Sequence, residues 1–135
     1  MSLYSQKVLR HFRHPQNMGE MKNPDSKVQV GNPVCGDVMQ MYLKIDKNKN
    51  GKEYIKDIKF QTLGCAAAIA VSSISTELVK GETLVEAEKL NSQKVIKSLE
   101  GLPKPKIHCS LLAIKAIKKA ILNYKSRTIE KAKAK

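Results

Sequence analysis

The sequence contains no tryptophan, and aromatic residues make up only 4% of its 135 residues. A hydrophobic core must therefore be built from aliphatic side chains, for which a hydrophobic content of 41% is sufficient. The chain also lacks an apolar run long enough to cross a bilayer, and it does not begin with an apolar secretory leader. We therefore expect one soluble, cytoplasmic domain with no membrane partner.

Acidic residues are scarce, with 12 Asp and Glu against 25 Lys and Arg, and the formal net charge is +13. Such a charge is typical of nucleic-acid-binding proteins. The lysines are spread along the chain, however, few aromatic side chains are available to stack on bases, and no nucleic-acid-binding motif is present. We predict no nucleic-acid partner. A solvated, lysine-rich surface is the simpler interpretation, and a basic face for acidic protein partners stays open.

Periodicity predicts an α+β domain of one N-terminal helix, a small three-stranded antiparallel sheet, and several C-terminal helices packed on one face of that sheet. Asn50-Gly51 predicts the turn of a hairpin between the last two strands. The expected helices cover residues 2–13, 65–80, 83–90, 91–99 and 109–124, the expected strands cover residues 27–30, 38–45 and 55–62, and residues 101–106 are expected to be extended. We assign residues 1–127 to one domain and residues 128–135 to a charged, flexible tail.

The three cysteines are Cys35, Cys65 and Cys109, and an odd count does not suit a disulfide framework. Cys35 lies in a glycine-flanked loop between strands, whereas Cys65 and Cys109 lie where helices are expected to begin. The N-terminus of a helix favours a thiolate through its unpaired N–H groups and partial positive charge. Thiolates are the ligands of iron–sulfur clusters and of many zinc sites.

Asp37 and His108 each lie within two residues of a cysteine and add an oxygen and a nitrogen donor. A surplus of ligands would allow one side chain to leave while the others hold a metal. Each residue alone has a simpler interpretation, as a buried cysteine, a turn aspartate or a surface histidine. His11 and His14 show no such spacing and are expected at the surface. The residues alone therefore indicate a metal or sulfur site.

Several short blocks follow one another in a fixed order: Tyr4-Ser5-Gln6-Lys7-Val8, His14-Pro15-Gln16-Asn17-Met18-Gly19, Gly31-Asn32-Pro33-Val34-Cys35-Gly36-Asp37-Val38, Thr62-Leu63-Gly64-Cys65-Ala66-Ala67-Ala68-Ile69-Ala70, Leu102-Pro103, and Lys106-Ile107-His108-Cys109-Ser110. In this order they resemble the IscU/NifU-type iron–sulfur cluster assembly scaffolds over nearly the whole chain. The Cys-Gly-Asp, Gly-Cys and His-Cys blocks together make the resemblance specific.

The resemblance implies that Cys35, Asp37, Cys65, His108 and Cys109 form an assembly site. A cysteine desulfurase would deliver sulfur as a persulfide, first to Cys109 and next to Cys35. With iron, from a frataxin-like donor for example, the site would build a 2Fe-2S cluster that Asp37 keeps labile, and would pass it to acceptor apo-proteins. Zinc would occupy the same residues in the cluster-free form. The chain would thus be an assembly scaffold and not an enzyme.

Two further implications concern assembly with other proteins. The family segment recognised by an Hsp70-type chaperone usually reads Leu-Pro-Pro-Val-Lys, but here it reads Leu102-Pro103-Lys104-Pro105-Lys106, which weakens the case for chaperone-assisted release. Tyr4 matches a tyrosine that family scaffolds use in dimer contacts, so the chain would be a monomer or a homodimer. The alternative for Tyr4 is a core-facing residue of the first helix.

Three other functions remain open on the sequence. A structural zinc protein would use the same residues but would unfold without metal. A persulfide sulfur carrier would need Cys109 but neither Asp37 nor Cys65. A basic nucleic-acid binder would bind duplex with a steep dependence on salt.

Overall fold

The computed structural model describes residues 4–32 and 37–133 of the chain. The elements follow the order α1 (Gln6–Arg13), β1 (Ser26–Asn32), β2 (Asp37–Lys47), β3 (Glu53–Thr62), α2 (Ala66–Val79), α3 (Leu84–Ala87), α4 (Ser92–Ser98), the 3-10 helix η2 (Lys104–Lys106) and α5 (Ile107–Lys133). The predicted α+β class is confirmed, with an N-terminal helix, a three-stranded antiparallel sheet and several C-terminal helices.

The sheet has the strand order β1-β2-β3, and both pairings are antiparallel. The predicted hairpin turn is present between β2 and β3, where Gly51 adopts a φ of 78° and its N–H donates to the carbonyl of Asn48 over 2.9 Å. Such a positive φ is accessible to glycine without steric cost, which explains why this residue closes the turn.

One irregularity sets which residues of β3 reach the core. Lys44 pairs with Asp57, but the next residue of β2, Ile45, pairs with Ile55, so Lys56 is an extra residue in β3. A bulge of this kind shifts the alternation of side chains. Ile55 and Ile58 are consequently both fully buried, although they are three positions apart.

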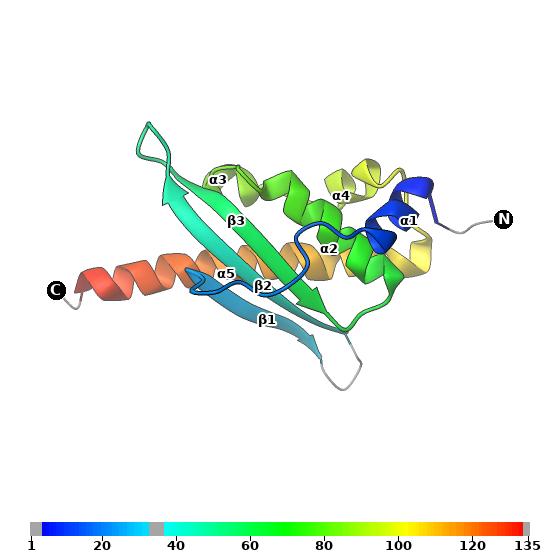
Figure 1. Cartoon of the computed structure of the whole chain (residues 1–135), viewed down its shortest axis with the longest axis horizontal. Coiled ribbons are helices and arrows are strands. Elements are labelled where there is room, and N and C mark those ends of the chain that lie inside the picture. Colours follow the sequence, from blue (N-terminus) through cyan, green and yellow to red (C-terminus); the bar gives the residue numbers. More distant parts are fainter. Residues whose placement is uncertain (1–3, 33–36, 134–135) are drawn as a thin grey trace.

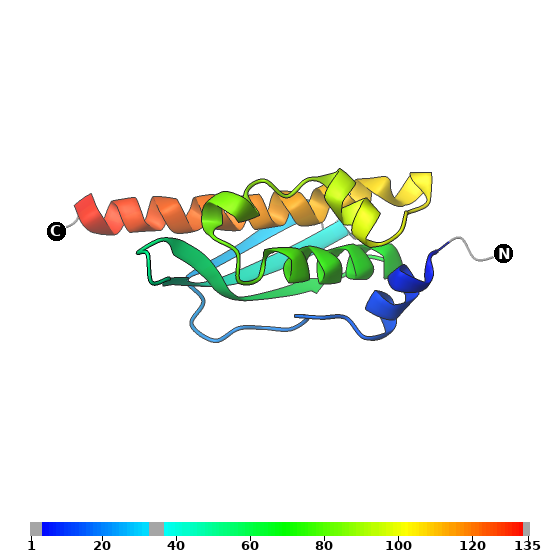
Figure 2. The same cartoon turned by 90° about the horizontal axis from the view of Figure 1, so that it is seen from above.

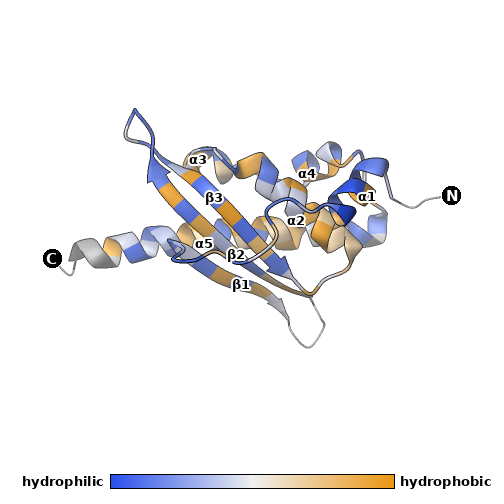
Figure 3. Ribbon diagram, in the orientation of Figure 1, coloured by the Kyte–Doolittle hydropathy of each residue, from blue (hydrophilic) through white to orange (hydrophobic). Residues whose placement is uncertain are grey.

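The core lies between the sheet and two helices. Figures 1 and 2 show α2 and α5 on the same side of the sheet, and Figure 3 shows apolar residues alternating with polar ones along the strands. The inward-facing side chains of the sheet are Val28, Val30, Met39, Met41, Leu43, Ile55, Ile58 and Phe60. They pack against small and aliphatic residues of the two helices, among them Ala67, Val71, Ala113, Ile117 and Ile121. The scarcity of aromatic residues is thus met by close packing of alanine against aliphatic side chains.

The two edges of the sheet differ. The outer edge of β3 is covered, because Met18 forms a parallel bridge with Phe60 and Thr83 forms an antiparallel bridge with Tyr54. Residues after Met18 then cross the outer face of the sheet on their way to β1 (Figures 1 and 2). In the part of the chain that the structure describes, no backbone segment pairs with the outer edge of β1. This edge is therefore open.

The first helix departs from the sequence prediction. It begins at Gln6, and Ser5 caps it by accepting a hydrogen bond from the N–H of Val8 over 3.1 Å. His11, expected at the surface, is only 8% exposed, whereas the neighbouring Phe12 is 42% exposed. The buried residues of this helix are Val8 and His11. A histidine suits its buried position because Ser73 of α2 offers its ring a hydrogen-bond partner.

The C-terminal third holds two further corrections. Residues 101–106 are not wholly extended, because Lys104–Lys106 form the 3-10 helix η2. The last helix does not end near Tyr124 but continues to Lys133. Within residues 4–32 and 37–133, no helix combines the length and apolar composition that a bilayer crossing requires.

Candidate functional site

Cys65 is placed by the junction between β3 and α2. It is the N-cap residue of α2 with an extended backbone, φ −76° and ψ −179°, and its side chain is exposed and forms no capping hydrogen bond. The preceding residue must be small, because a Cβ on Gly64 would lie 2.6 Å from the Cβ of Ala68 and 3.2 Å from Oγ1 of Thr62. Glycine thus allows the strand to turn directly into the helix, and the turn holds the thiol at the surface.

His108 and Cys109 lie in the first turn of α5. The helix begins at Ile107, directly after η2, where the N–H of Lys106 donates to the carbonyl of Pro103 over 2.8 Å. The His108 side chain is exposed. Cys109 follows as the third residue of the helix, so its backbone is placed, while its side chain lies outside what the structure describes. Both residues therefore lie at the N-terminal end of α5, where the carbonyl of Lys104 in η2 accepts a hydrogen bond from the N–H of Ile107.

Asp37 is the first residue of β2, and only its backbone is described. Its neighbour Val38 is tied to the end of β3, because the Val38 carbonyl accepts hydrogen bonds from Oγ1 of Thr62 over 2.9 Å and from the N–H of Leu63 over 3.2 Å. Asp37 is therefore held close to the segment that leads into Cys65. Cys35 lies outside the described residues.

The amino ends of β2, α2 and α5 lie at the same end of the molecule (Figure 1). One side-chain contact joins two of them directly, because Nζ of Lys106 lies 3.8 Å from Sγ of Cys65. The two residues are 41 positions apart, and no local pattern in the sequence indicates that they meet. Only the packing of α5 against α2 reveals this pairing of an ammonium with a sulfur.

Among the side chains that the structure describes, no group of three or more His, Cys, Asp and Glu is arranged to hold a metal. Of the five expected ligands, only Cys65 and His108 have described side chains. The complete ligand set therefore stays a prediction.

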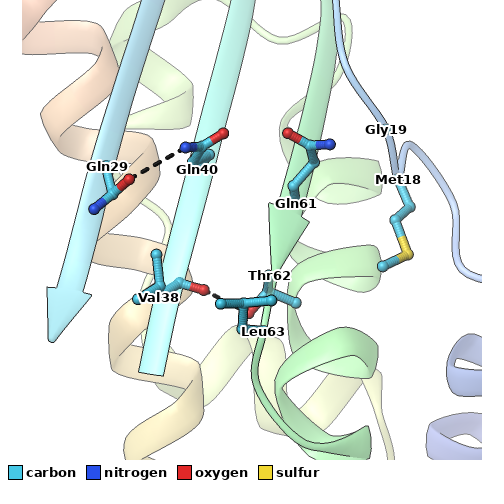
Figure 4. A pocket seen from close by; sticks show the side chains of 8 residues that line it. All are labelled: Met18, Gly19, Gln29, Val38, Gln40, Gln61, Thr62 and Leu63. Carbon is cyan, nitrogen blue, oxygen red and sulfur yellow. Dashed lines mark hydrogen bonds between the residues drawn. The ribbon is translucent and has the colours of Figure 1, made fainter. Parts of the chain in front are cut away.

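A groove of about 550 Å³ lies beside this end of the molecule, on the outer face of the sheet (Figure 4). Its floor is a row of glutamines, with Nε2 of Gln40 donating to Oε1 of Gln29 over 3.2 Å. Two exposed apolar side chains flank it, Met18 at 41% and Leu63 at 78% exposure. The described residues that line the groove carry amide, hydroxyl and apolar groups and no titratable one, so they contribute uncharged surface next to the candidate ligands.

Comparison with known proteins is consistent with this arrangement of elements. The model of the NifU-like N terminal domain family matches residues 3–131. The chain belongs to this family. The predicted resemblance is therefore confirmed over nearly the whole sequence.

Two relatives of this NifU-like domain are named iron–sulfur cluster assembly scaffold proteins. The chain is 50% identical to IscU 1 of Archaeoglobus fulgidus over 133 residues, covering 97% of this chain and 84% of the relative. It is 46% identical to IscU of Escherichia coli K12 over 127 residues, covering 92% and 95%. Both names describe assembly scaffolds and not enzymes, as expected for this chain.

The fold of this NifU-like domain also matches a solved structure. The N-terminal part of a nitrogen-fixing NifU-like protein from Brucella abortus superposes with a TM-score of 0.64 at 21% identity, over 92% of this chain and 95% of that one. At this level of identity the match supports the fold alone.

Proposed function

We propose that this protein is a scaffold on which iron–sulfur clusters are assembled and from which they are transferred to acceptor apo-proteins. Its cargo would be a labile 2Fe-2S cluster, held by Cys35, Asp37, Cys65, His108 and Cys109. Family membership and the scaffold names of relatives that are 46% and 50% identical support this role.

The observation that carries the proposal is the meeting of two ligand-bearing segments at one end of the fold. The 3.8 Å contact between Lys106 and Cys65 brings the start of α5, with His108 and Cys109, next to the start of α2. A cationic side chain beside a cysteine favours the thiolate form, and thiolates are the ligands that iron–sulfur clusters require. Asp37 and Cys35 would complete the site from the adjoining end of β2.

Sulfur would arrive as a persulfide on a cysteine desulfurase. The Cys109 thiolate attacks the outer sulfur of that persulfide, the sulfur–sulfur bond of the donor breaks, and the donor's thiolate leaves. Cys35 would be the next acceptor. Conversion of the transferred sulfur to sulfide consumes an electron pair, which a separate reductant must supply. The cysteine desulfurase, an iron donor and the acceptor apo-proteins are therefore the partners that this function requires.

The exposed positions of two candidate ligands suit a cluster that must be released to other proteins. Cys65 and His108 are exposed at helix starts and not enclosed in the core. Asp37 adds an oxygen ligand to a mainly thiolate set, and such a hard donor binds iron–sulfur iron less strongly than thiolate does. The same set of donors would accept Zn²⁺ when no cluster is present.

The test is anaerobic assembly, in which the purified protein is mixed with ferrous iron, cysteine, a reductant and a cysteine desulfurase. Sulfur-to-iron charge-transfer bands in the visible spectrum should grow with time, and Cys35→Ser, Cys65→Ser and Cys109→Ser should each abolish the stable cluster. Ser126→Ala, an exposed change on α5 far from these residues, is the control and should assemble the cluster normally.

Each alternative function has its own signature in this experiment. Persulfide on Cys109 without charge-transfer bands would identify a sulfur carrier. Tightly held zinc with neither signal would identify a structural metal site.

A further inference from the structure

The open edge of β1 is bordered by a row of lysines. Lys115, Lys118 and Lys119 are exposed on α5, which packs beside β1, and Nζ of Lys119 donates to the carbonyl of Gln29 over 3.0 Å. Because this carbonyl accepts a bond from outside the sheet, it points away from β2. The N–H of the same residue points the same way in an antiparallel strand, as do the backbone groups of Gly31 two positions on.

These elements enclose a shallow groove of about 520 Å³ between β1 and α5. Gln29, Val30 and Gly31 of β1 border it on one side, and the three lysines of α5 border it on the other. Leu122, which is 64% exposed, adds an apolar contact on the α5 side. The groove thus combines a strand edge that no other described strand pairs with, positive charge and one apolar side chain.

The positive charge of this groove is not neutralised nearby. The ion pairs of the described residues engage Lys44, Lys56, Lys80, Lys89 and Lys125, and none of the three groove lysines. No Asp or Glu occurs in the sequence between Glu100 and Glu130, and none occurs from Ser26 to Gly36. The groove therefore attracts anionic groups from outside the molecule.

We infer that the groove between β1 and α5 binds an extended, acidic segment of a partner protein, which adds to the sheet as a fourth strand on the edge of β1. Strand addition supplies backbone hydrogen bonds, and alternate side chains supply specificity. Acidic side chains on one face of that strand would meet Lys115, Lys118 and Lys119, and an apolar side chain would contact Leu122. This role goes beyond cluster assembly and does not depend on it.

Two other occupants fit the groove less well. A second copy of this chain would bring the same lysines and a net charge of +13 against them, so like charges oppose pairing through this edge. A nucleic acid would need contacts to bases as well as to phosphate, but the described residues that line the groove include no arginine and no aromatic side chain for stacking. The open backbone of β1 matches a peptide strand and not a nucleotide.

The probe is a fluorescent peptide in which glutamate alternates with valine and threonine, and the reference probe carries lysine in place of glutamate. Fluorescence anisotropy should show saturable binding of the acidic peptide only. The variant Lys115→Glu/Lys118→Glu/Lys119→Glu should weaken binding by about tenfold or more, as expected for the loss of three exposed ion pairs. The matched variant Lys47→Glu/Lys49→Glu/Lys52→Glu changes the net charge equally at the hairpin turn and should leave binding nearly unchanged.

Hydrogen exchange separates strand addition from simple charge attraction. Saturation with the acidic peptide should slow exchange of the outward-pointing amides of Gln29 and Gly31. Gln29→Pro removes one of these donors without removing a bond to β2, and it should weaken the peptide while Gln29→Ala does not. Circular dichroism of each variant verifies that the fold is intact.

Three results would overturn the inference. Equal weakening of peptide binding in both lysine variants would show that the peptide responds only to the net charge of the protein. Unchanged exchange at Gln29 and Gly31 under saturating peptide would exclude strand addition. Tighter, lysine-dependent binding of a short DNA duplex than of the acidic peptide would assign the groove to nucleic acid.

Discussion

His11 links the first helix to α2 through a buried hydrogen bond. Its Nδ1 lies 2.7 Å from Oγ of Ser73 in α2. Burial lowers the pKa of His11 below 6.5, the nearby charges of Lys7 and Arg10 act in the same direction, and Glu77 opposes them. The folded protein therefore prefers the neutral imidazole.

This preference makes stability depend on pH. Because the pKa of His11 is lower in the folded state than the unfolded value of 6.5, its contribution is fully present above that value and is lost as the pH falls through the folded pKa. Urea unfolding should show stability falling as the pH drops below the unfolded pKa of about 6.5, with a slope for this residue of at most about 1.4 kcal/mol per pH unit. His11→Gln should remove this part of the pH dependence, whereas His14→Gln, at an exposed position, should retain it.

Asp37 is expected to control the release of cargo if the protein is the scaffold proposed above. Asp37→Ala should leave cluster assembly intact but slow transfer to an acceptor apo-ferredoxin by about tenfold or more, because an exchangeable oxygen ligand is lost. Transfer is followed by the circular dichroism of the cluster in the visible range. Asp57→Ala, on the outer face of β3, is the control. Transfer by Asp37→Ala at the normal rate would contradict the role.

Single residues show how far a sequence can define this site. Cys65 was expected at a helix start because Gly64 and a run of alanines surround it, and that position is confirmed. The proximity of Lys106 to Cys65 could not be foreseen, because it depends on how α5 packs on α2 and not on any local pattern. The burial of His11 was missed for the same reason, since its partner Ser73 lies 62 positions away.

Where β3 meets α2, one glycine determines whether the two elements fit. Gly64→Ala should destabilise the protein by about 1–3 kcal/mol, because the new Cβ would clash with Ala68 and crowd Thr62. The same strain should shift Cys65 and reduce the yield of assembled cluster. Urea unfolding and the visible spectrum measure the two effects.

A second change tests that this clash is the cause. Ala68→Gly removes the carbon that the new Cβ would meet, although it costs about 1 kcal/mol by itself in a helix. In a double-mutant cycle, Gly64→Ala combined with Ala68→Gly should be less destabilised than the sum of the two single changes. Additive losses of stability would show that the clash with Ala68 does not cause the strain.

Elements with strong local signals were predictable, and those set by distant contacts were not. Asn50-Gly51 correctly predicted the hairpin. The helix predicted to begin at residue 91 is α4, and the Asn91 side chain caps it by accepting a hydrogen bond from the N–H of Lys94 over 2.9 Å. The bulge at Lys56 has no local signature, so the shift that buries both Ile55 and Ile58 was not foreseen. Tyr42 faces away from the core, yet it is only 3% exposed; its hydroxyl donates to Gln40 and Gln61, and Nζ of Lys27 lies 5.4 Å from the centre of its ring.

The molecule as a whole keeps its core apart from the candidate site. The buried hydrophobic cluster is aliphatic apart from Phe60, and it contains neither Cys65 nor His108. Tyr4 is half-buried and packs against this cluster, so its role in dimer contacts stays a prediction. Burial of this kind stabilises the fold without help from a bound ion.

The chain should therefore remain folded without metal. After treatment with a strong chelator, far-UV circular dichroism should be unchanged and urea unfolding should stay cooperative, with a free energy of about 5–15 kcal/mol. A zinc-saturated sample should unfold at a somewhat higher urea concentration, because the ion binds the folded state only. A random-coil spectrum after chelation would instead identify a structural metal.

α5 is one continuous helix from Ile107 to Lys133. It therefore fixes both the direction of His108 around the helix axis and its position along that axis. Each residue turns the helix by about 100°, so the direction of His108 is set by the number of residues between it and the buried Ile114 and Ile117. One residue inserted after Leu111 would rotate His108 by about 100° relative to Ile114 and Ile117 while the rest of the helix stays packed on the sheet. An insertion of about seven residues, close to two full turns, would restore the direction but move His108 about 10 Å further along the axis. Insertions of different lengths in α5 can thus test separately the direction of His108 and its position along the helix axis.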